Sequence, residues 1–292
     1  MSIILKNSRI ELLVDLPEDN YQLSRFDWTG KIVGLKFDSV CLTTSEEKSA
    51  KNSSFLGQGF YNEFGIKSPL GFIEAKEGEW FHKIGIGLLK KQGKVYDFNK
   101  PYEMKPAVFK TTTTASSIIL SCTAQTANGY GYVLTKKILL LADGFKVLYV
   151  LKNTGSKVIE TTEYCHNFLA MEYLSSDRYS LNFSFIPAPS RFNETLNPNN
   201  YIGFKMNKVS MLKGLNQTFY FSNLSGSKLV SSKWELQDHL NKVSISEQGD
   251  FETRMVNLWG AGHVVSPELF VAIELAPHKS FSWQRTYSIR KL

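Results

Sequence analysis

The chain has 292 residues, of which 42% are hydrophobic and 21% charged, a balance typical of a soluble globular protein. No stretch approaches the length of a membrane span, so we expect no membrane partner. The formal net charge is +7, but Lys and Arg are scattered and form no run that could follow a nucleic-acid backbone. The charge therefore indicates a basic, solvated surface and no nucleic-acid partner.

Short β-rich runs separated by turn residues follow one another in the middle of the chain. Asn128-Gly129 and Asp143-Gly144 lie between such runs, and Asn-Gly and Asp-Gly are strong signals for tight hairpins. The sequence predicts an antiparallel meander of at least four strands, over Ser117–Thr126, Tyr130–Leu141, Phe145–Leu151 and Lys157–His166.

The same pattern continues to the end of the chain, where we predict strands over Thr218–Asn223, Val230–Leu236, Val243–Glu247, His263–Leu275 and Phe281–Ile289. Helical periodicity is scarce, and loops are expected at Ser45–Ser54 and Pro187–Asn200. No change of composition and no linker divides the sequence. We predict an all-β protein, a large antiparallel β-sandwich in a single domain spanning residues 1–292.

The cysteines Cys41, Cys122 and Cys165 have neither metal-ligand spacing nor the density of a disulfide framework. We expect three free thiols. The N-terminal segment has no secretory apolar region, because acidic residues follow it between Asp15 and Asp19. Together these features indicate a cytoplasmic protein.

One face of the strand Lys157–His166 is a candidate binding surface. Glu160, Thr162, Tyr164 and His166 share that face, while Thr161, Glu163 and Cys165 share the other. Cys165 and His166 therefore point in opposite directions and cannot form a catalytic dyad. The polar and aromatic face is either a platform for a carbohydrate or the solvated side of an edge strand, and periodicity alone favours the second interpretation.

A second candidate lies near the C-terminus, where Asn257–Gly260 is followed by the run His263–Glu268. There an apolar strand ends on a proline and a carboxylate, with Trp259 nearby. Glu268 is either a catalytic base in a half-dry site or an ordinary surface glutamate, and the residue pattern alone favours the surface glutamate.

Several of these segments resemble one enzyme superfamily. The run Glu163–Phe168 resembles the strand that carries the catalytic histidine of aldose 1-epimerases and hexose-6-phosphate epimerases, and Val264–Glu268 resembles the later strand that ends in their catalytic glutamate. Phe270–Ser280 is similar to the apolar strand and turn before their last strand. The chain thus resembles the galactose mutarotase-like superfamily over nearly its whole length.

The N-terminal half shows the same likeness in looser form. Ser24–Gly30 and Gly57–Gly65 lie where the family has its first sugar-facing loops, and Glu79–Gly87 resembles an uncharacterised subgroup of the superfamily. One position departs from the family pattern. Leu70 stands before Gly71-Phe72, where these epimerases usually place a second histidine, and His82 is the nearest replacement.

The resemblance implies interconversion of sugar anomers by acid–base ring opening, without a cofactor or metal. It implies Glu268 as base and His166 as acid, facing each other with about 6–8 Å for a sugar ring, as in two-carboxylate glycosidases. It further implies substrate contacts from Arg25, His82, Trp259, Tyr164 and Asn167. The partner is a small-molecule sugar: an aldohexose, with or without a phosphate, or an oligosaccharide.

Two alternatives stay open, a carbohydrate-binding protein without turnover and an accessory module of a sugar lyase or hydrolase. The oligomeric state is left open.

Overall fold

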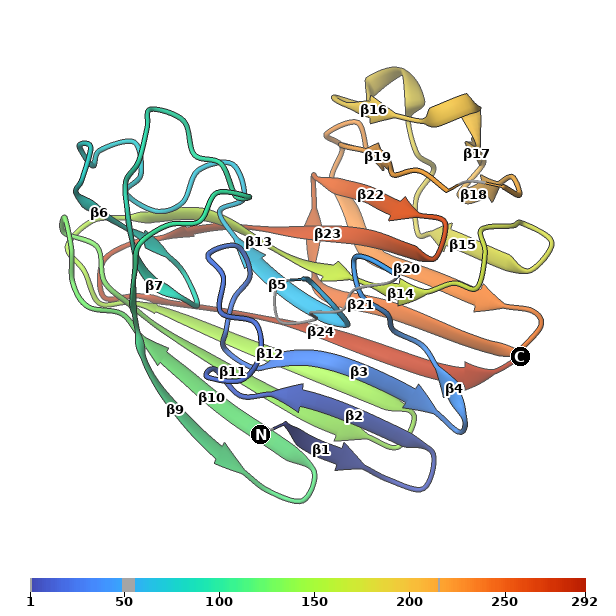
Figure 1. Ribbon diagram of the computed structural model, residues 1–292, viewed down its shortest axis with the longest axis horizontal. Coiled ribbons are helices and arrows are strands. Elements are labelled where there is room, and N and C mark those ends of the chain that lie inside the picture. Colours follow the sequence, from blue (N-terminus) through green and yellow to red (C-terminus); the bar gives the residue numbers. More distant parts are fainter. Residues whose placement is uncertain (1, 49–55, 215) are drawn as a thin grey trace.

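The computed structural model describes residues 2–48, 56–214 and 216–292, and it is built almost entirely from antiparallel β-strands (Figure 1). Its two large sheets enclose a common hydrophobic core. Within the described residues the helical segments are two short 3₁₀ turns, η2 (Pro189–Arg191) and η3 (Pro198–Asn200), and no helix is long and apolar enough to cross a membrane. The predicted all-β, antiparallel sandwich is confirmed.

The first large sheet has eleven strands. Its order is β1-β2-β3-β5-β13-β23-β22-β19-β16, with β4 paired to β3 and β14 paired to β23. The strands are β1 (Ile3–Lys6), β2 (Ile10–Asp15), β3 (Lys31–Phe37), β4 (Val40–Cys41), β5 (Phe60–Phe64), β13 (Ile159–Asn167), β14 (Leu169–Ala170), β16 (Thr195–Leu196), β19 (Phe219–Phe221), β22 (Val256–Ala261) and β23 (Val264–Leu275).

The second large sheet has ten strands in the order β17-β18-β15-β20-β21-β24-β12-β11-β10-β9. They are β9 (Val108–Thr113), β10 (Ser117–Thr123), β11 (Tyr132–Leu141), β12 (Gly144–Asn153), β15 (Tyr179–Phe183), β17 (Ile202–Lys205), β18 (Lys208–Met211), β20 (Val230–Asp238), β21 (Val243–Thr253) and β24 (Ser280–Lys291). A three-stranded sheet comprises β6 (Trp80–Lys83), β7 (Gly87–Lys90) and β8 (Met104–Pro106).

The predicted meander is correct for three strands and wrong for the fourth. β10, β11 and β12 are hydrogen-bonded neighbours, but β13 lies in the other large sheet. The strand that pairs with the free side of β12 is instead β24. Asn153 holds the crossover, since its side chain donates to the carbonyls of Lys157 (2.8 Å) and Leu275 (2.9 Å) and accepts from the amide of Gly155 (2.9 Å). The turn residues Asn153-Thr154-Gly155 indicate that the chain changes direction, but they do not indicate which sheet the next strand joins.

The later predicted strands are confirmed as β19, β20, β21, β23 and β24. The predicted loop Pro187–Asn200 carries both 3₁₀ turns and the two-residue β16. The predicted loop Ser45–Ser54 lies partly outside the described residues, and its first residue forms an isolated bridge with Gln58. All three cysteines are free thiols as expected, with Cys41 exposed and Cys122 and Cys165 buried.

Side chains alternate along β13 between two different environments. Glu163, Cys165 and Asn167 face the interior between the large sheets, where Cys165 joins the main core. Tyr164 and His166 face the opposite side, beside a second cluster of buried aromatic residues that includes Phe26, Tyr61 and Phe168. The predicted separation of Cys165 and His166 is confirmed, because each belongs to a different face of the sheet.

Candidate functional site

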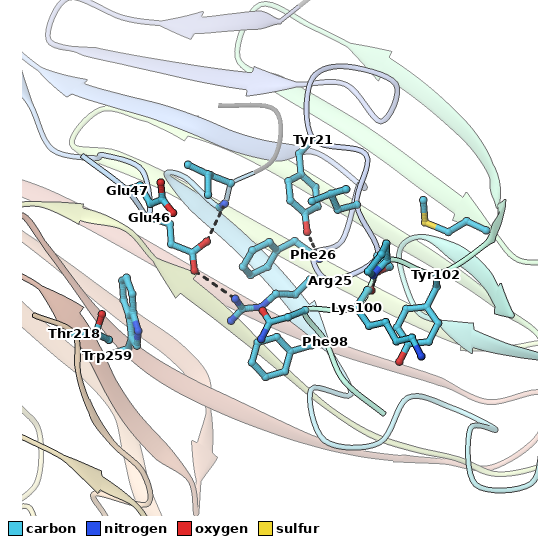
Figure 2. Close-up of a pocket in the computed structure, with 17 residues that line it drawn as sticks. Tyr21, Arg25, Phe26, Glu46, Glu47, Phe98, Lys100, Tyr102, Thr218 and Trp259 are labelled. Atoms are coloured by element: carbon cyan, nitrogen blue, oxygen red, sulfur yellow. Dashed lines mark hydrogen bonds and ion pairs between the residues drawn. The ribbon is translucent and has the colours of Figure 1, made fainter. Parts of the chain in front are cut away.

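A cavity of about 520 Å³ lies on the face of the eleven-stranded sheet that carries the second aromatic cluster (Figure 2). Its walls are rich in aromatic rings, and a few charged groups point into it. The aromatic residues are Tyr21, Phe26, Phe98, Tyr102 and Trp259, and the charged ones are Arg25, Glu46, Glu47 and Lys100. Apolar walls with a small number of placed polar groups are typical of a small-molecule site.

The segment between β2 and β3 brings Arg25 to this cavity, although it contains no strand of its own. The backbone amide of Asp27 donates to the carbonyl of Asn62 in β5 (2.8 Å). The buried ammonium of Lys31 gathers the first part of the segment by donating to three carbonyls, those of Pro17 (3.1 Å), Asp19 (2.7 Å) and Tyr21 (3.1 Å). Hydrogen bonds to the neighbouring strands β3 and β5 therefore hold this coil in place, as buried backbone groups require.

Arg25 is held from several sides. Its Nε donates to Oε2 of the fully buried Glu63 (3.1 Å), Nη1 lies 3.6 Å from Oε1 of Glu46, and Nη2 donates to the hydroxyl of Tyr164 (3.4 Å). The guanidinium also lies over the rings of Phe26 and Phe98, 4.5 Å from each centroid (Figure 2). Burial alone would lower the pKa of Arg25, but Tyr164, Glu63 and Glu46 hold it above its ordinary value.

His166 on β13 and Glu268 on β23 lie side by side, with Nε2 and Oε1 3.4 Å apart. The last residue pair in the ladder of these strands is Tyr164 with Phe270, so two further steps place His166 opposite Glu268 on the same face. The predicted gap of about 6–8 Å is wrong. Cross-strand neighbours have Cβ atoms about 4.5–5.5 Å apart, which leaves no room for a sugar ring between them.

The pair lies next to the cavity, and its two side chains are only 3% and 5% exposed. The His166 ring stacks on Phe168, with centroids 4.0 Å apart, and meets the edges of two cavity-lining rings, Trp259 (5.0 Å) and Phe26 (6.1 Å). His166 thus contacts the cavity through two of its lining rings, and neither His166 nor Glu268 is itself part of the lining.

Burial controls the ionisation of the pair. Burial raises the pKa of Glu268 to about 8, although the positive charge of Arg25 acts to lower it. Burial also lowers the pKa of His166 well below its ordinary value, and the charge of Arg25 lowers it further. At neutral pH the resting pair thus holds one proton on Glu268, next to a neutral imidazole. This reverses the expected resting state, in which the carboxylate is the base and the imidazolium the acid.

Two predicted contact residues lie away from the cavity. His82 is fully buried in β6 against the rings of Tyr130 and Tyr132, and its backbone amide donates to the carbonyl of Leu70 (2.9 Å). Leu70 is itself a core residue, so neither side chain takes the place of a second sugar-facing histidine. Asn167 faces the inter-sheet interior, where it donates to Glu247 (3.1 Å) and accepts from Tyr287 (3.0 Å).

The other predicted contacts gather at the site. Arg25 and Trp259 line the cavity, and Tyr164 lies just below, where its hydroxyl donates to Glu63 (2.7 Å). Sequence reasoning missed Glu46, Phe98, Lys100 and Tyr102, which come from loops without periodicity or motif. Within the described residues, no group of three or more His, Cys, Asp or Glu is arranged to hold a metal ion.

Solved structures of galactose mutarotase-like proteins share this β-sandwich fold over nearly the whole chain. A galactose mutarotase-like protein from Lactobacillus casei is 13% identical with a TM-score of 0.60, covering 99% of this chain and 100% of its own. Another from Clostridium acetobutylicum is 13% identical with a TM-score of 0.58, covering 100% and 95%. A provisionally assigned aldose 1-epimerase from Escherichia coli K12 is 11% identical with a TM-score of 0.62, covering 100% and 99%. No family model and no curated protein matches the sequence. At these identities the likeness shows the fold alone. That fold is the one predicted from the resemblance in sequence.

Proposed function

We propose that the protein is a cofactor-free isomerase that interconverts the anomers of a small sugar. The observation that carries the proposal is the contact of 3.4 Å between His166 Nε2 and Glu268 Oε1, next to an aromatic cavity whose lining residues Trp259 and Phe26 contact His166. Two titratable groups whose environment moves their pKa values in opposite directions are a common acid–base arrangement. The aromatic walls suit the apolar face of a sugar.

Anomer exchange requires one proton to be given and one to be taken. In our proposal, Glu268 gives its proton to the ring oxygen while Nε2 of His166 takes the proton of the C1 hydroxyl. The ring opens to the aldehyde, the C1–C2 bond rotates, and the two transfers reverse on closure, so the pair returns to its starting state. The sugar lies above the adjacent pair, with the ring oxygen and the C1 hydroxyl both pointing down. Admission of these atoms requires the side chains of Phe26 or Trp259 to move aside.

Variants of the pair test the proposal. Glu268→Gln keeps shape but cannot transfer the proton, and His166→Asn removes the other partner, so each should lower the catalysed exchange rate by about 10² or more. The double variant should be scarcely slower than either single variant, because the two groups act as one unit. The measurement is the loss of optical rotation of freshly dissolved α-glucose and α-galactose, corrected for the buffer rate. Wild-type exchange rates in both single variants would refute the assignment.

A second candidate function is sugar binding without turnover. It is favoured by the low exposure of His166 and Glu268, which leaves the cavity usable as a binding site while the pair stays covered. A methyl glycoside cannot open its ring, so its binding can be followed by the fluorescence of the half-buried Trp259 independently of catalysis. Binding in the absence of any accelerated exchange would establish this function in place of the isomerase.

A further inference from the structure

The charges around the cavity decide whether it can take a phosphorylated sugar. Its described lining carries two cations, Arg25 and Lys100, and two carboxylates, Glu46 and Glu47. The charges cancel, although the whole protein has a formal charge of +7. A phosphate monoester brings a charge of about −1.5 to −2 at neutral pH and therefore needs a surplus of cations around it.

Each of the three nitrogens of Arg25, the central cation, already faces an oxygen atom of a neighbouring side chain. Nε donates a hydrogen bond to Glu63 (3.1 Å), Nη2 donates one to the hydroxyl of Tyr164 (3.4 Å), and Nη1 lies 3.6 Å from the carboxylate of Glu46. Glu63 is fully buried and is shared with the ammonium of Lys83 (3.0 Å), so it is a fixed part of the sheet. Glu46 lies in the segment after β4 and is more exposed, and it is the carboxylate that occupies the cavity side of the guanidinium (Figure 2).

The second cation offers little compensation. Lys100 is half-buried, and its ammonium already donates to the carbonyl of Gln92 (3.3 Å). The exposed carboxylate of Glu47 lines the same cavity. A phosphate group would thus meet two carboxylates, one partly engaged ammonium and a guanidinium that already faces carboxylates, whereas sugar hydroxyls can donate hydrogen bonds to both cavity carboxylates.

We infer that the cavity selects neutral sugars, and that Glu46 is the residue that keeps sugar phosphates out by holding Arg25 and repelling the phosphate. The inference rests on the proposed sugar-binding function and settles the charge of the substrate, which the family resemblance leaves open. Specificity of this kind comes from an unfavourable contact with the rejected ligand as much as from contacts with the accepted one.

The test compares α-glucose, α-galactose and α-mannose with their 6-phosphates in the anomer-exchange assay. We expect kcat/KM to be at least about tenfold higher for the best neutral sugar than for its phosphate. Glu46→Gln should narrow this preference by about tenfold, since it removes the negative charge that lies beside Nη1 of Arg25 and repels the phosphate. The matched control is Glu11→Gln, an exposed carboxylate on β2 that is also paired with a lysine, and it should leave the preference unchanged.

Equal or better turnover of the phosphates by wild type would overturn the inference, and so would an unchanged preference in a folded Glu46→Gln variant. If no sugar is exchanged at all, the isomerase function fails but the inference is still decided by binding. Titration with methyl α-glucoside, methyl α-galactoside and methyl α-mannoside and with their 6-phosphates, followed by Trp259 fluorescence, should then show tighter binding of a neutral glycoside. Tighter or equal binding of the phosphates, or binding of neither, would contradict the inference.

Discussion

At the scale of single residues, burial decides which histidine or glutamate holds a proton. His82 lies against two tyrosine rings, and burial lowers its pKa to about 4, against the opposing effect of backbone contacts at Ala127 and Tyr130. Its neutral form is therefore preferred in the folded protein, whereas the unfolded chain protonates it near the ordinary value of about 6.5. Because the unfolded state binds the extra proton, stability must fall as the pH drops from 6.5 towards 4.

His82→Phe should remove this part of the acid sensitivity. Between pH 7 and pH 5, protonation of His82 in the unfolded state should lower the unfolding free energy of wild type by about 2 kcal/mol. The decrease in the variant should be smaller by this amount. Urea unfolding at the two pH values measures it. The exposed His239→Gln serves as the control and should behave as wild type. An equal pH-dependent loss in His82→Phe and wild type would contradict the argument.

The sequence located some site residues and misplaced others for identifiable reasons. Alternation along one strand was sufficient to place Tyr164 and His166 together, and the resemblance added Glu268. Asn167 was predicted on the same side as its neighbour His166 but faces the opposite side, because one step along a strand reverses the face. Glu46 could not be found, since its contact with Arg25 joins two irregular segments that carry no pattern.

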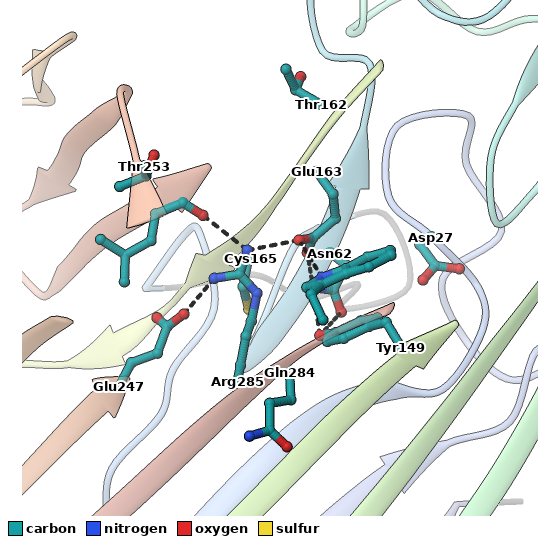
Figure 3. A network of polar contacts seen from close by, with 12 residues as sticks. Asp27, Asn62, Tyr149, Thr162, Glu163, Cys165, Glu247, Thr253, Gln284 and Arg285 are labelled. Carbon is teal, nitrogen blue, oxygen red and sulfur yellow. Dashed lines mark hydrogen bonds and ion pairs between the residues drawn. The ribbon is translucent and has the colours of Figure 1, made fainter. Parts of the chain in front are cut away.

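At the scale of elements, a buried ionic network joins the two large sheets (Figure 3). Arg285 on β24 lies between two fully buried carboxylates, 2.7 Å from Glu163 on β13 and 2.5 Å from Glu247 on β21. Trp283 donates to Glu163 (3.1 Å) and Trp234 donates to Glu247 (2.8 Å). Nothing in the strand patterns indicates this network, because alternation predicts that these positions face inward but not that charges will pair there.

Arg285→Met should be strongly destabilising, because it leaves two buried carboxylates without their cation. A loss of about 3–5 kcal/mol is expected from breaking a buried pair of this kind. Arg290→Met on the same strand is the control. Its guanidinium is paired with Glu235 but lies mostly in solvent, so the cost should stay below about 1 kcal/mol. Chemical denaturation of both variants gives the comparison, and equal losses would show that the network contributes no more than a surface ion pair.

At the scale of the whole molecule, one core serves both large sheets, and we propose that the chain folds as a single domain. The core includes side chains from β2, β11, β13, β20 and β24, which come from both sheets and both halves of the sequence. Tryptophan fluorescence and far-UV circular dichroism should therefore report the same unfolding midpoint in the experiment above. Hairpin signals predicted the local ladders well, but the assignment of strands to sheets depends on such long-range packing and could not be predicted from local sequence.

The function that we propose for the whole molecule depends on a His166–Glu268 pair that holds one proton, and the pH dependence of anomer exchange tests this proposal most directly. The measurement is exchange spectroscopy of an equilibrium sugar mixture with wild-type protein from pH 6.5 to 9.5, corrected for buffer. We predict an acceleration proportional to protein concentration that is constant from pH 6.5 to 7.5. Above about pH 8, where Glu268 loses its proton, the acceleration should fall about tenfold per pH unit. No acceleration with any sugar, or a catalysed rate that rises through pH 9, would contradict the account.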